Sequence, residues 1–307
     1  MMSCMRLLVA WATPVMLAGV AIGFLVPPLA AAARPLLTAL IVATLSVAVM
    51  RTDMATLSGA LRRPQLPAVH VLWLLGVSPL LMHLALLAMP VAPALHGPLV
   101  LYAASAAITS MPAFALLFGL DATFVLIGVT AAALASPLTV PAIAWLVLGD
   151  ALPLDPVAMA IRMAAIIGGS YLVGIALRRL FGAARVAGWK LQLDTFFVIA
   201  ATLLGIAVMD GVLDLTLARP HAMAATVTAV FGGSLVLVAL ATLLFWPGGL
   251  TTALGAGLNS GPRNISIMLA VVGSAAGEEL VMTVAAAQLP IFVFPLFQRP
   301  LIRWLLA

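Results

Sequence analysis

The sequence predicts an all-α protein that crosses a membrane about ten times, and three observations lead to this fold class. Of the 307 residues, 65% are hydrophobic and only 7% are charged, whereas a soluble domain carries roughly 25% charged residues. The apolar residues gather into stretches long enough for a spanning helix, which needs about 20 residues. The basic residues lie mostly between these stretches and favour one side of them. With a mean hydropathy of +1.26, the chain has no room for a soluble domain.

Charged residues mark the ends of most of the ten predicted helices. In chain order, the helices cover residues 7–26, after Arg6; 35–50, between Arg34 and Arg51; 67–89, after Arg62 and Arg63; 98–119, before Asp121; 123–148, between Asp121 and Asp150; 156–177, between Asp155 and Arg178; 193–213, after Lys190; 222–246, after Arg219; 250–273, with Arg263 near its middle; and 280–306, after Glu278 and Glu279. An arginine at bilayer depth costs about 2.5 to 3.5 kcal/mol on insertion scales, so Arg263 is a candidate functional residue.

The positions of the basic residues explain the net charge of +5 without a nucleic-acid partner. When the helix ends are assigned alternately to two sides, one side receives Arg6, Arg51, Arg62, Arg63, Arg178, Arg179, Arg185, Lys190, Arg299 and Arg303. The other side receives Arg34 and Arg219, with Arg162 just inside the sixth helix. By the positive-inside rule, both termini are predicted to be cytoplasmic, in a multi-pass protein of a bacterial-type inner membrane.

The first 33 residues also have features of a cleaved signal peptide, namely Arg6, an apolar run and Ala31-Ala-Ala33. We interpret them as a retained helix, because the run is long for a signal and its loss would spoil the charge asymmetry. The single cysteine, Cys4, excludes an intramolecular disulfide and a cysteine-based metal site.

Two sets of short matches indicate an internal repeat. Val47-Ala-Val-Met50 with Leu61-Arg-Arg-Pro64 is echoed by Ile206-Ala-Val-Met209 with Leu217-Ala-Arg-Pro220. Ser110-Met-Pro112 is echoed by Ser260-Gly-Pro262, and Val129-Thr-Ala-Ala-Ala133 with Pro137 by Thr283-Val-Ala-Ala-Ala287 with Pro290. Five helices separate the matches, which predicts two inverted halves, 1–150 and 151–307, of one membrane domain. Such repeats are typical of secondary transporters, although Ala-rich and Pro-rich sequence also produces chance echoes.

Equivalent prolines predict that the fourth and ninth helices are interrupted. Pro112 and Pro262, the latter beside Gly261, each remove a backbone hydrogen bond from a helix interior. The freed backbone groups at membrane depth must face protein, an ion or water. We therefore expect the two broken helices to cross in the core. The alternative is that the prolines only kink these helices.

Three segments of the chain resemble the bile acid:sodium symporter family, within the wider superfamily of bile, arsenite and riboflavin transporters. They are the segment from Met50 to Pro64, the passage from Gly119-Leu-Asp-Ala122 to Pro137, and Gly261-Pro-Arg-Asn264 followed by Leu269-Ala270. The resemblance implies a panel formed by the first, second, sixth and seventh helices and a core that contains the crossed fourth and ninth helices. It also implies sodium-coupled uptake of an amphipathic or organic anion.

The chain departs from this family at the positions that would hold sodium. The family's glutamate falls on Asn259 and its glutamine on Arg263, while its Ser-Asn pair falls on Met111 and Pro112. A guanidinium has no lone pair to offer a cation. We therefore expect the sodium sites to be lost, with Arg263 standing in for the ion and gripping a carboxylate or sulfonate. Transport would then be driven by the substrate gradient or by protons.

The candidate substrate site comprises polar residues near the two predicted breaks. They are Asn259, Ser260, Arg263 and Asn264 of the ninth helix, Thr109 and Ser110 of the fourth, and Gln288 of the tenth, with Pro112, Gly261 and Pro262 as the helix breaks. Thr109 and Ser110 are equally suited to hydrogen bonds between helices, and for Gln288 such a bond is the favoured interpretation. Among the acids, Asp121 is expected to cap a helix, and Asp210 is a candidate proton carrier. His83 is expected to be a buried, hydrogen-bonded ring rather than a metal ligand.

The sequence therefore predicts a secondary transporter of a small organic anion. It contains no catalytic order of Ser, His and Asp, no phosphate-binding loop and no metal motif, so we do not expect an enzyme, a cofactor or a nucleic-acid partner. The expected partners are the substrate and the lipid bilayer, and the oligomeric state is open. The alternative is a nontransporting sensor or scaffold that retains the transporter fold.

Overall fold

The computed structural model describes residues 2–52, 65–89, 91–148, 155–273 and 276–306. These residues form an all-α protein whose extended backbone pairing is limited to one isolated bridge, between Ala107 and Arg263. Of the segment from Met50 to Pro64, which carries part of the family resemblance, the structure describes only residues 50–52. Arg62 and Arg63 lie outside the described residues. Asp150 and the predicted boundary between the halves lie outside them as well.

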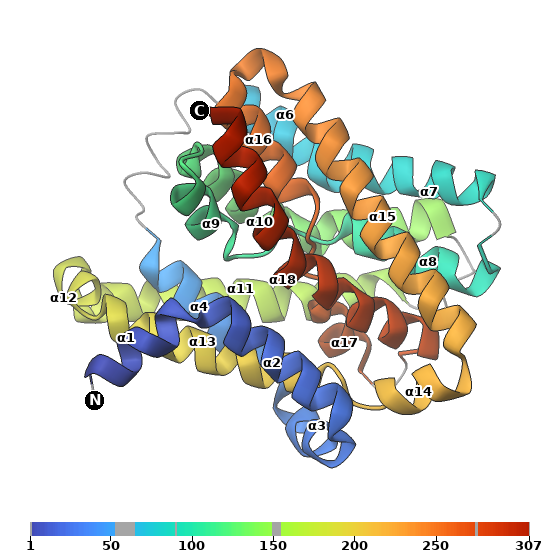
Figure 1. Ribbon diagram of the computed structural model, residues 1–307, viewed down its shortest axis with the longest axis horizontal. Coiled ribbons are helices and arrows are strands. Elements are labelled where there is room, and N and C mark those ends of the chain that lie inside the picture. Colours follow the sequence, from blue (N-terminus) through green and yellow to red (C-terminus); the bar gives the residue numbers. More distant parts are fainter. Residues whose placement is uncertain (1, 53–64, 90, 149–154, 274–275, 307) are drawn as a thin grey trace.

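The helices follow the predicted apolar stretches closely (Figure 1). They are α1 (Met2–Ala10), α2 (Ala12–Leu25), α3 (Pro27–Ala33), α4 (Leu37–Arg51), α6 (Gln65–Leu72), α7 (Ser78–Ala88), α8 (Pro93–Ala104), α9 (Met111–Phe118), α10 (Ala122–Ile143), α11 (Pro156–Phe181), α12 (Ala183–Gly188), α13 (Lys190–Ala207), α14 (Val212–Ala218), α15 (Pro220–Leu244), α16 (Leu250–Ser260), α17 (Ser266–Val272) and α18 (Glu278–Leu306). Short 3-10 turns cover Arg34–Leu36 and Trp246–Gly248, and π-helical turns cover Trp73–Val77 and Ala144–Leu148.

Fewer continuous spans are present in the described residues than the ten predicted stretches. Seven helical segments are long and apolar enough to cross a membrane, or eight if the bent pair of α1 and α2 counts as one span. That pair bends by 76° beside Trp11. The two remaining stretches, 98–119 and 250–273, are each divided into two short helices by a non-helical break. The chain is thus a multi-pass membrane protein by helix length and composition.

Side-chain caps explain where two of the long helices begin. The carboxylate of Asp121 accepts a hydrogen bond of 3.0 Å from the Phe124 amide at the start of α10. Asp155 accepts one of 2.9 Å from the Val157 amide at the start of α11. Both bonds satisfy amide groups that the first turn of a helix leaves free, and the predicted capping role of Asp121 is confirmed.

The helices α2, α4, α11 and α13 pack against one another, in the lower half of Figure 1. These are the helices of the stretches that the resemblance assigns to the panel. Their close approach depends on small residues: a Cβ at Gly23 of α2 would lie 2.7 Å from the carbonyl oxygen of Ile206, and one at Gly174 of α11 would lie 2.6 Å from that of Ser46. Small residues permit this backbone contact where a lipid environment provides little hydrophobic drive between helices.

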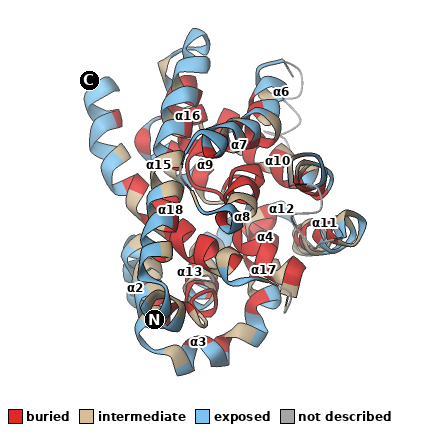
Figure 2. Ribbon diagram, turned by 90° about the vertical axis from the view of Figure 1, so that its right-hand side faces the viewer, coloured by how far each residue is buried: buried red, intermediate tan, exposed pale blue. Residues whose placement is uncertain are grey.

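A second group of helices surrounds the two breaks. The helix α15 packs against α16 and α18, and α10 packs against α6, α8, α9 and α16. Buried residues (red) gather in the interior of the helix arrangement, and exposed residues (pale blue) lie on its outside (Figure 2). Many of the exposed residues are large and apolar, including Leu84, Leu138, Leu172, Leu203 and Leu243, as expected for surfaces that contact lipid.

Candidate functional site

The two helix breaks lie against each other in the core. The first break separates α8 from α9 at residues 105–110, and the second separates α16 from α17 at residues 261–265. The Asn264 amide donates to the Ala106 carbonyl over 2.8 Å, and Ala107 and Arg263 form an antiparallel bridge. Segments about 150 residues apart in the chain thus satisfy part of each other's backbone, which interrupted helices at membrane depth require.

The prolines have different places at the two breaks. Pro262 and Gly261 lie within the second break, as predicted. Pro112 instead lies in the first turn of α9, after a non-helical segment that begins at Ser105. A missing amide is tolerated in the first turn of a helix, so Pro112 begins the second half-helix rather than interrupting a continuous one.

Arg263 is fully buried, with an exposed fraction of 0%. Its Nε donates to the Ser260 carbonyl over 3.1 Å, and its Nη1 donates to the carbonyls of Leu74 and Ser105 over 3.1 and 3.2 Å. Its Nη2 donates to the Ser78 hydroxyl over 2.9 Å. The guanidinium has five N–H groups, and four hydrogen bonds from it thus end on the protein itself.

The neighbours of Arg263 in the ninth predicted stretch also make internal contacts. Asn259 donates from Nδ2 to the Val125 carbonyl over 3.0 Å, while its Oδ1 has no hydrogen-bond partner. The Ser260 hydroxyl donates to the Ala256 carbonyl over 2.7 Å and accepts from the Trp73 indole over 2.9 Å. Asn264 is half-buried and contributes its backbone amide to the crossing.

Gln288 of α18 contacts another helix, which is one of the two roles expected from the sequence. Its Nε2 donates to the Val284 carbonyl over 3.0 Å and lies 3.4 Å from the hydroxyl of Ser266, the first residue of α17. Ser110 precedes α9 directly, at the position of its cap, and makes no capping hydrogen bond with its side chain.

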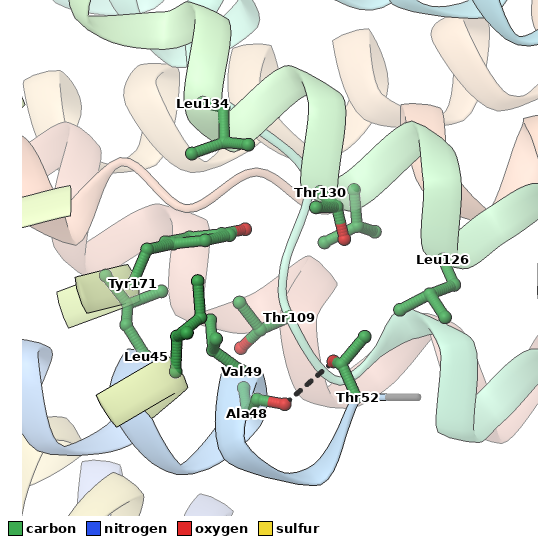
Figure 3. A pocket seen from close by; sticks show the side chains of 11 residues that line it. Leu45, Ala48, Val49, Thr52, Thr109, Leu126, Thr130, Leu134 and Tyr171 are labelled. Atoms are coloured by element: carbon green, nitrogen blue, oxygen red, sulfur yellow. Dashed lines mark hydrogen bonds between the residues drawn. The ribbon is translucent and has the colours of Figure 1, made fainter. Parts of the chain in front are cut away.

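A cavity of about 150 Å³ lies between the panel helices and the first break (Figure 3). Its walls come from α4, α10, α11 and the break residue Thr109, and the lining residues are Leu45, Ala48, Val49, Thr52, Thr109, Leu126, Val129, Thr130, Leu134, Tyr171 and Ile175. The lining is mainly apolar, and its side-chain polar groups are the hydroxyls of three threonines and one tyrosine. Thr109 is therefore the predicted site residue that reaches this cavity, whereas Arg263 and Asp210 do not line it.

Two arginines lie close to the lining residues of this cavity along the chain. Arg51 follows the lining residues of α4 and pairs with Asp194 of α13 over 2.6 Å. Arg178, one turn beyond the lining residue Ile175, donates to the Met50 carbonyl over 2.8 Å. Both cations belong to the side that the charge pattern predicts to be cytoplasmic.

Several buried residues of the third predicted helix, which contribute polar side chains or a backbone carbonyl to the site, were not identified from the sequence. Trp73, Leu74 and Ser78 contact the second break directly. His70, expected only to lie near a helix end, is fully buried and stacks on Phe124 with ring centroids 4.5 Å apart. A polar residue in an apolar stretch reveals no partner by itself, because the partners come from helices remote in the sequence.

The histidine expected to be hydrogen-bonded, His83, has its partner in the next helix. Its Nδ1 lies 2.8 Å from Nε2 of His96 in α8. Among the described residues, no group of three or more histidine, cysteine or acidic side chains is arranged to hold a metal ion. The His83 ring is hydrogen-bonded as expected, but it is half-buried rather than buried.

The residues at the second break do not fit the sodium ion that the resemblance implies. At the two positions where the family has a glutamate and a glutamine, this chain has a neutral Asn259 and the cation Arg263, whose donors already occupy the nearby carbonyl oxygens. A fixed positive charge at this place repels a second cation. No protein-family model and no curated protein matches the chain.

Proposed function

We propose that the chain is a secondary transporter that carries a small organic anion through the cavity between the panel helices and the first break. The observation that carries the proposal is the position of this cavity, which touches both helix groups and a residue of the crossing, Thr109. In transporters with inverted repeats, substrate sites lie where interrupted helices meet, and one bundle moves against the other.

The lining of the cavity supports an amphipathic substrate. Seven of its eleven lining residues are apolar. The Thr52 hydroxyl donates to the Ala48 carbonyl over 2.9 Å, which leaves Thr109 and the hydrogen-bonded pair of Thr130 and Tyr171 to donate to an oxygen-rich head group. A cavity of this volume accommodates a molecule of about the size of benzene. Arg51 and Arg178 lie close in the chain to lining residues, with Arg51 paired to Asp194, and benzoate and short-chain carboxylates or sulfonates are suitable probes.

The finer architecture belongs to the same proposal: ten spans in two inverted halves, 1–150 and 151–307, of a bacterial-type inner-membrane protein with cytoplasmic termini. The breaks between α8 and α9 and between α16 and α17 support it, because each is followed by a long helix with an internal proline, Pro137 in α10 and Pro290 in α18. The two ends of the chain, marked N and C, lie toward the left of Figure 1, as does α12, which follows Arg178 and Arg179.

Uptake into proteoliposomes tests the transport function. The purified protein is expected to accumulate at least one labelled anion of the panel. Thr109→Val together with Thr130→Val is expected to raise its KM by about a hundredfold, since each lost hydrogen bond to a charged group is worth about 1.5 kcal/mol and the two together about 3 kcal/mol. Thr228→Val is the matched control, because Thr228 lies exposed on α15 and bonds only to the Ala224 carbonyl of its own helix.

The outcome also separates the transporter from a nontransporting sensor or scaffold. A folded protein that binds an anion of the panel without accumulating it would support the sensor. A folded protein that neither binds nor accumulates any of them would contradict the proposed function. If uptake required sodium, the assignment of Arg263 as a replacement for the coupling ion would be wrong.

A further inference from the structure

Three carbonyl oxygens converge on Arg263, and each lacks its usual backbone donor. Ser260 is the last residue of α16 and Ser105 directly follows α8, so their carbonyls face the breaks rather than another helical turn. The amide four residues beyond Ser260 belongs to Asn264 and bonds to Ala106 instead. We call these two carbonyls, the Leu74 carbonyl and the Ser78 hydroxyl the carbonyl cage.

The Leu74 carbonyl is free for a different reason. In the π-helical turn Trp73–Val77, the Ser78 amide bonds to the Trp73 carbonyl, and the next residue, Pro79, has no amide hydrogen. The Leu74 carbonyl therefore accepts from the Ser78 hydroxyl over 2.8 Å and from Arg263 over 3.1 Å.

The carbonyl cage is an environment built for a cation. The C-terminal ends of two helices each contribute a partial negative charge, and buried carbonyls without donors are costly at membrane depth. Rings of backbone carbonyls are also the ligands that select monovalent metal ions in channels. A guanidinium satisfies the same oxygens from within the chain.

We propose that Arg263 is a tethered cation in a latent metal-ion site, and that its removal leaves a carbonyl cage that binds a monovalent metal cation. The wild-type protein then folds and remains stable without any such ion. This inference does not depend on the transport function, since it concerns the cation dependence of stability. It accounts for both the complete burial of Arg263 and its four internal hydrogen bonds.

Thermal unfolding in detergent tests the inference, with sodium, potassium and choline chloride compared at equal ionic strength. The wild-type Tm is expected to be the same in all three salts. Arg263→Gln is expected to have a lower Tm in choline, and replacing choline with sodium or potassium should raise it by roughly 2–5 °C, the shift produced by a ligand well above its Kd. Arg162→Gln is the matched control, because Arg162 also donates to a helix-end carbonyl, that of Val271, but lies exposed on α11.

Two results would overturn the inference: a wild-type Tm that rises in sodium relative to choline, or a folded Arg263→Gln variant that responds to the three salts as the wild type does. If Arg263→Gln cannot be purified, Arg263→Lys provides the test. Its ammonium keeps a charge near the carbonyl cage, so it is expected to fold and to be indifferent to sodium. A lysine variant that sodium stabilises would contradict the tethered-cation role.

Discussion

At the scale of single residues, Gly128 of α10 provides the space in which two buried polar side chains meet. A Cβ at this position would lie 2.6 Å from Nδ1 of His70 and 2.9 Å from Nδ2 of Asn259. His70 cannot move aside readily, because its ring packs against Phe124 and Phe245 and is fully buried. The residue with no side chain therefore determines how α6, α10 and α16 approach one another.

Gly128→Ala is accordingly expected to lower the free energy of unfolding by about 1 to 3 kcal/mol, the usual cost of overpacking a core. Gly169→Ala in α11 is the matched control, since no atom lies within 4 Å of the added Cβ. In a helix interior, that change is expected to be neutral or to stabilise by up to about 1 kcal/mol. Thermal unfolding of both variants in detergent measures the difference, and an unchanged Tm for Gly128→Ala would show that the three helices adjust.

At the scale of helices, Tyr102 of α8 forms a hydrogen bond to the backbone of the second break. Its hydroxyl donates to the Gly261 carbonyl over 3.0 Å and lies 2.7 Å from the Ser234 hydroxyl of α15. The chain's other tyrosine, Tyr171 of α11, lines the cavity instead. Tyr102 joins α8 to α15 and to the second break, whereas the Tyr171 hydroxyl bonds to Thr130 at the cavity.

Replacing each tyrosine with phenylalanine is expected to separate these roles. Tyr102→Phe leaves the buried Gly261 carbonyl without this donor, which costs about 1 to 3 kcal/mol, so its Tm is expected to fall. Tyr171→Phe is expected to change the Tm less and to raise the KM for the transported anion. Unfolding curves and proteoliposome uptake are measured on the same preparations, and a reversed pattern would contradict the assignment of the two residues.

The sequence predicts the helix positions well because each depends on local properties. Hydropathy places every long helix, and Asp121 marks the start of α10 by a short-range cap. The bend beside Trp11 and the π-helical turn at Trp73–Val77 have no comparable local signal. The carbonyl cage could not be predicted either, because Leu74, Ser105 and Ser260 are brought together only by the crossing of the breaks. The sequence identified Arg263 correctly as unusual, but its contacts with internal carbonyls depend on that tertiary arrangement.

At the scale of the whole molecule, the cavity lies toward one end of the helices, and the ion pairs of Arg219 with Glu278 and Glu279 lie toward the other. The cavity is near Thr52 and Arg178, on the predicted cytoplasmic side. Toward the other side, Arg219 bonds to Glu278 and Glu279 of α18 over 2.8 and 2.9 Å. The hydrogen bonds that Arg219 donates to Glu278 and Glu279 raise its pKa above the ordinary value, so the guanidinium stays charged. In the proposed transporter, this arrangement corresponds to a cavity reached from the predicted cytoplasmic side.

Access to the cavity should therefore be one-sided. In a Cys4→Ala background, which removes the chain's single cysteine, Thr109→Cys is expected to react with a membrane-impermeant maleimide in inside-out vesicles and not in right-side-out vesicles. Thr228→Cys on the exposed face of α15 is the control for a lipid-facing thiol, and it is expected to react in neither.

Removing the ion pairs of Arg219 tests whether they keep the cavity closed toward the side opposite the predicted cytoplasmic one. Adding Arg219→Ala to Thr109→Cys removes the ion pairs between α18 and the residue that connects α14 to α15. Labelling of Thr109→Cys in right-side-out vesicles is therefore expected to rise at least severalfold. Because Arg219 is exposed, its ion pairs contribute little to stability, and the Tm should stay close to that of the parent. Charge reversal at both ends, Arg219→Glu with Glu278→Arg and Glu279→Arg, restores the attraction and should return labelling to the parent level. Equal labelling from both sides before Arg219 is changed would mean that the cavity is not closed on the outer side. The proposed movement of one helix group against the other would then be contradicted.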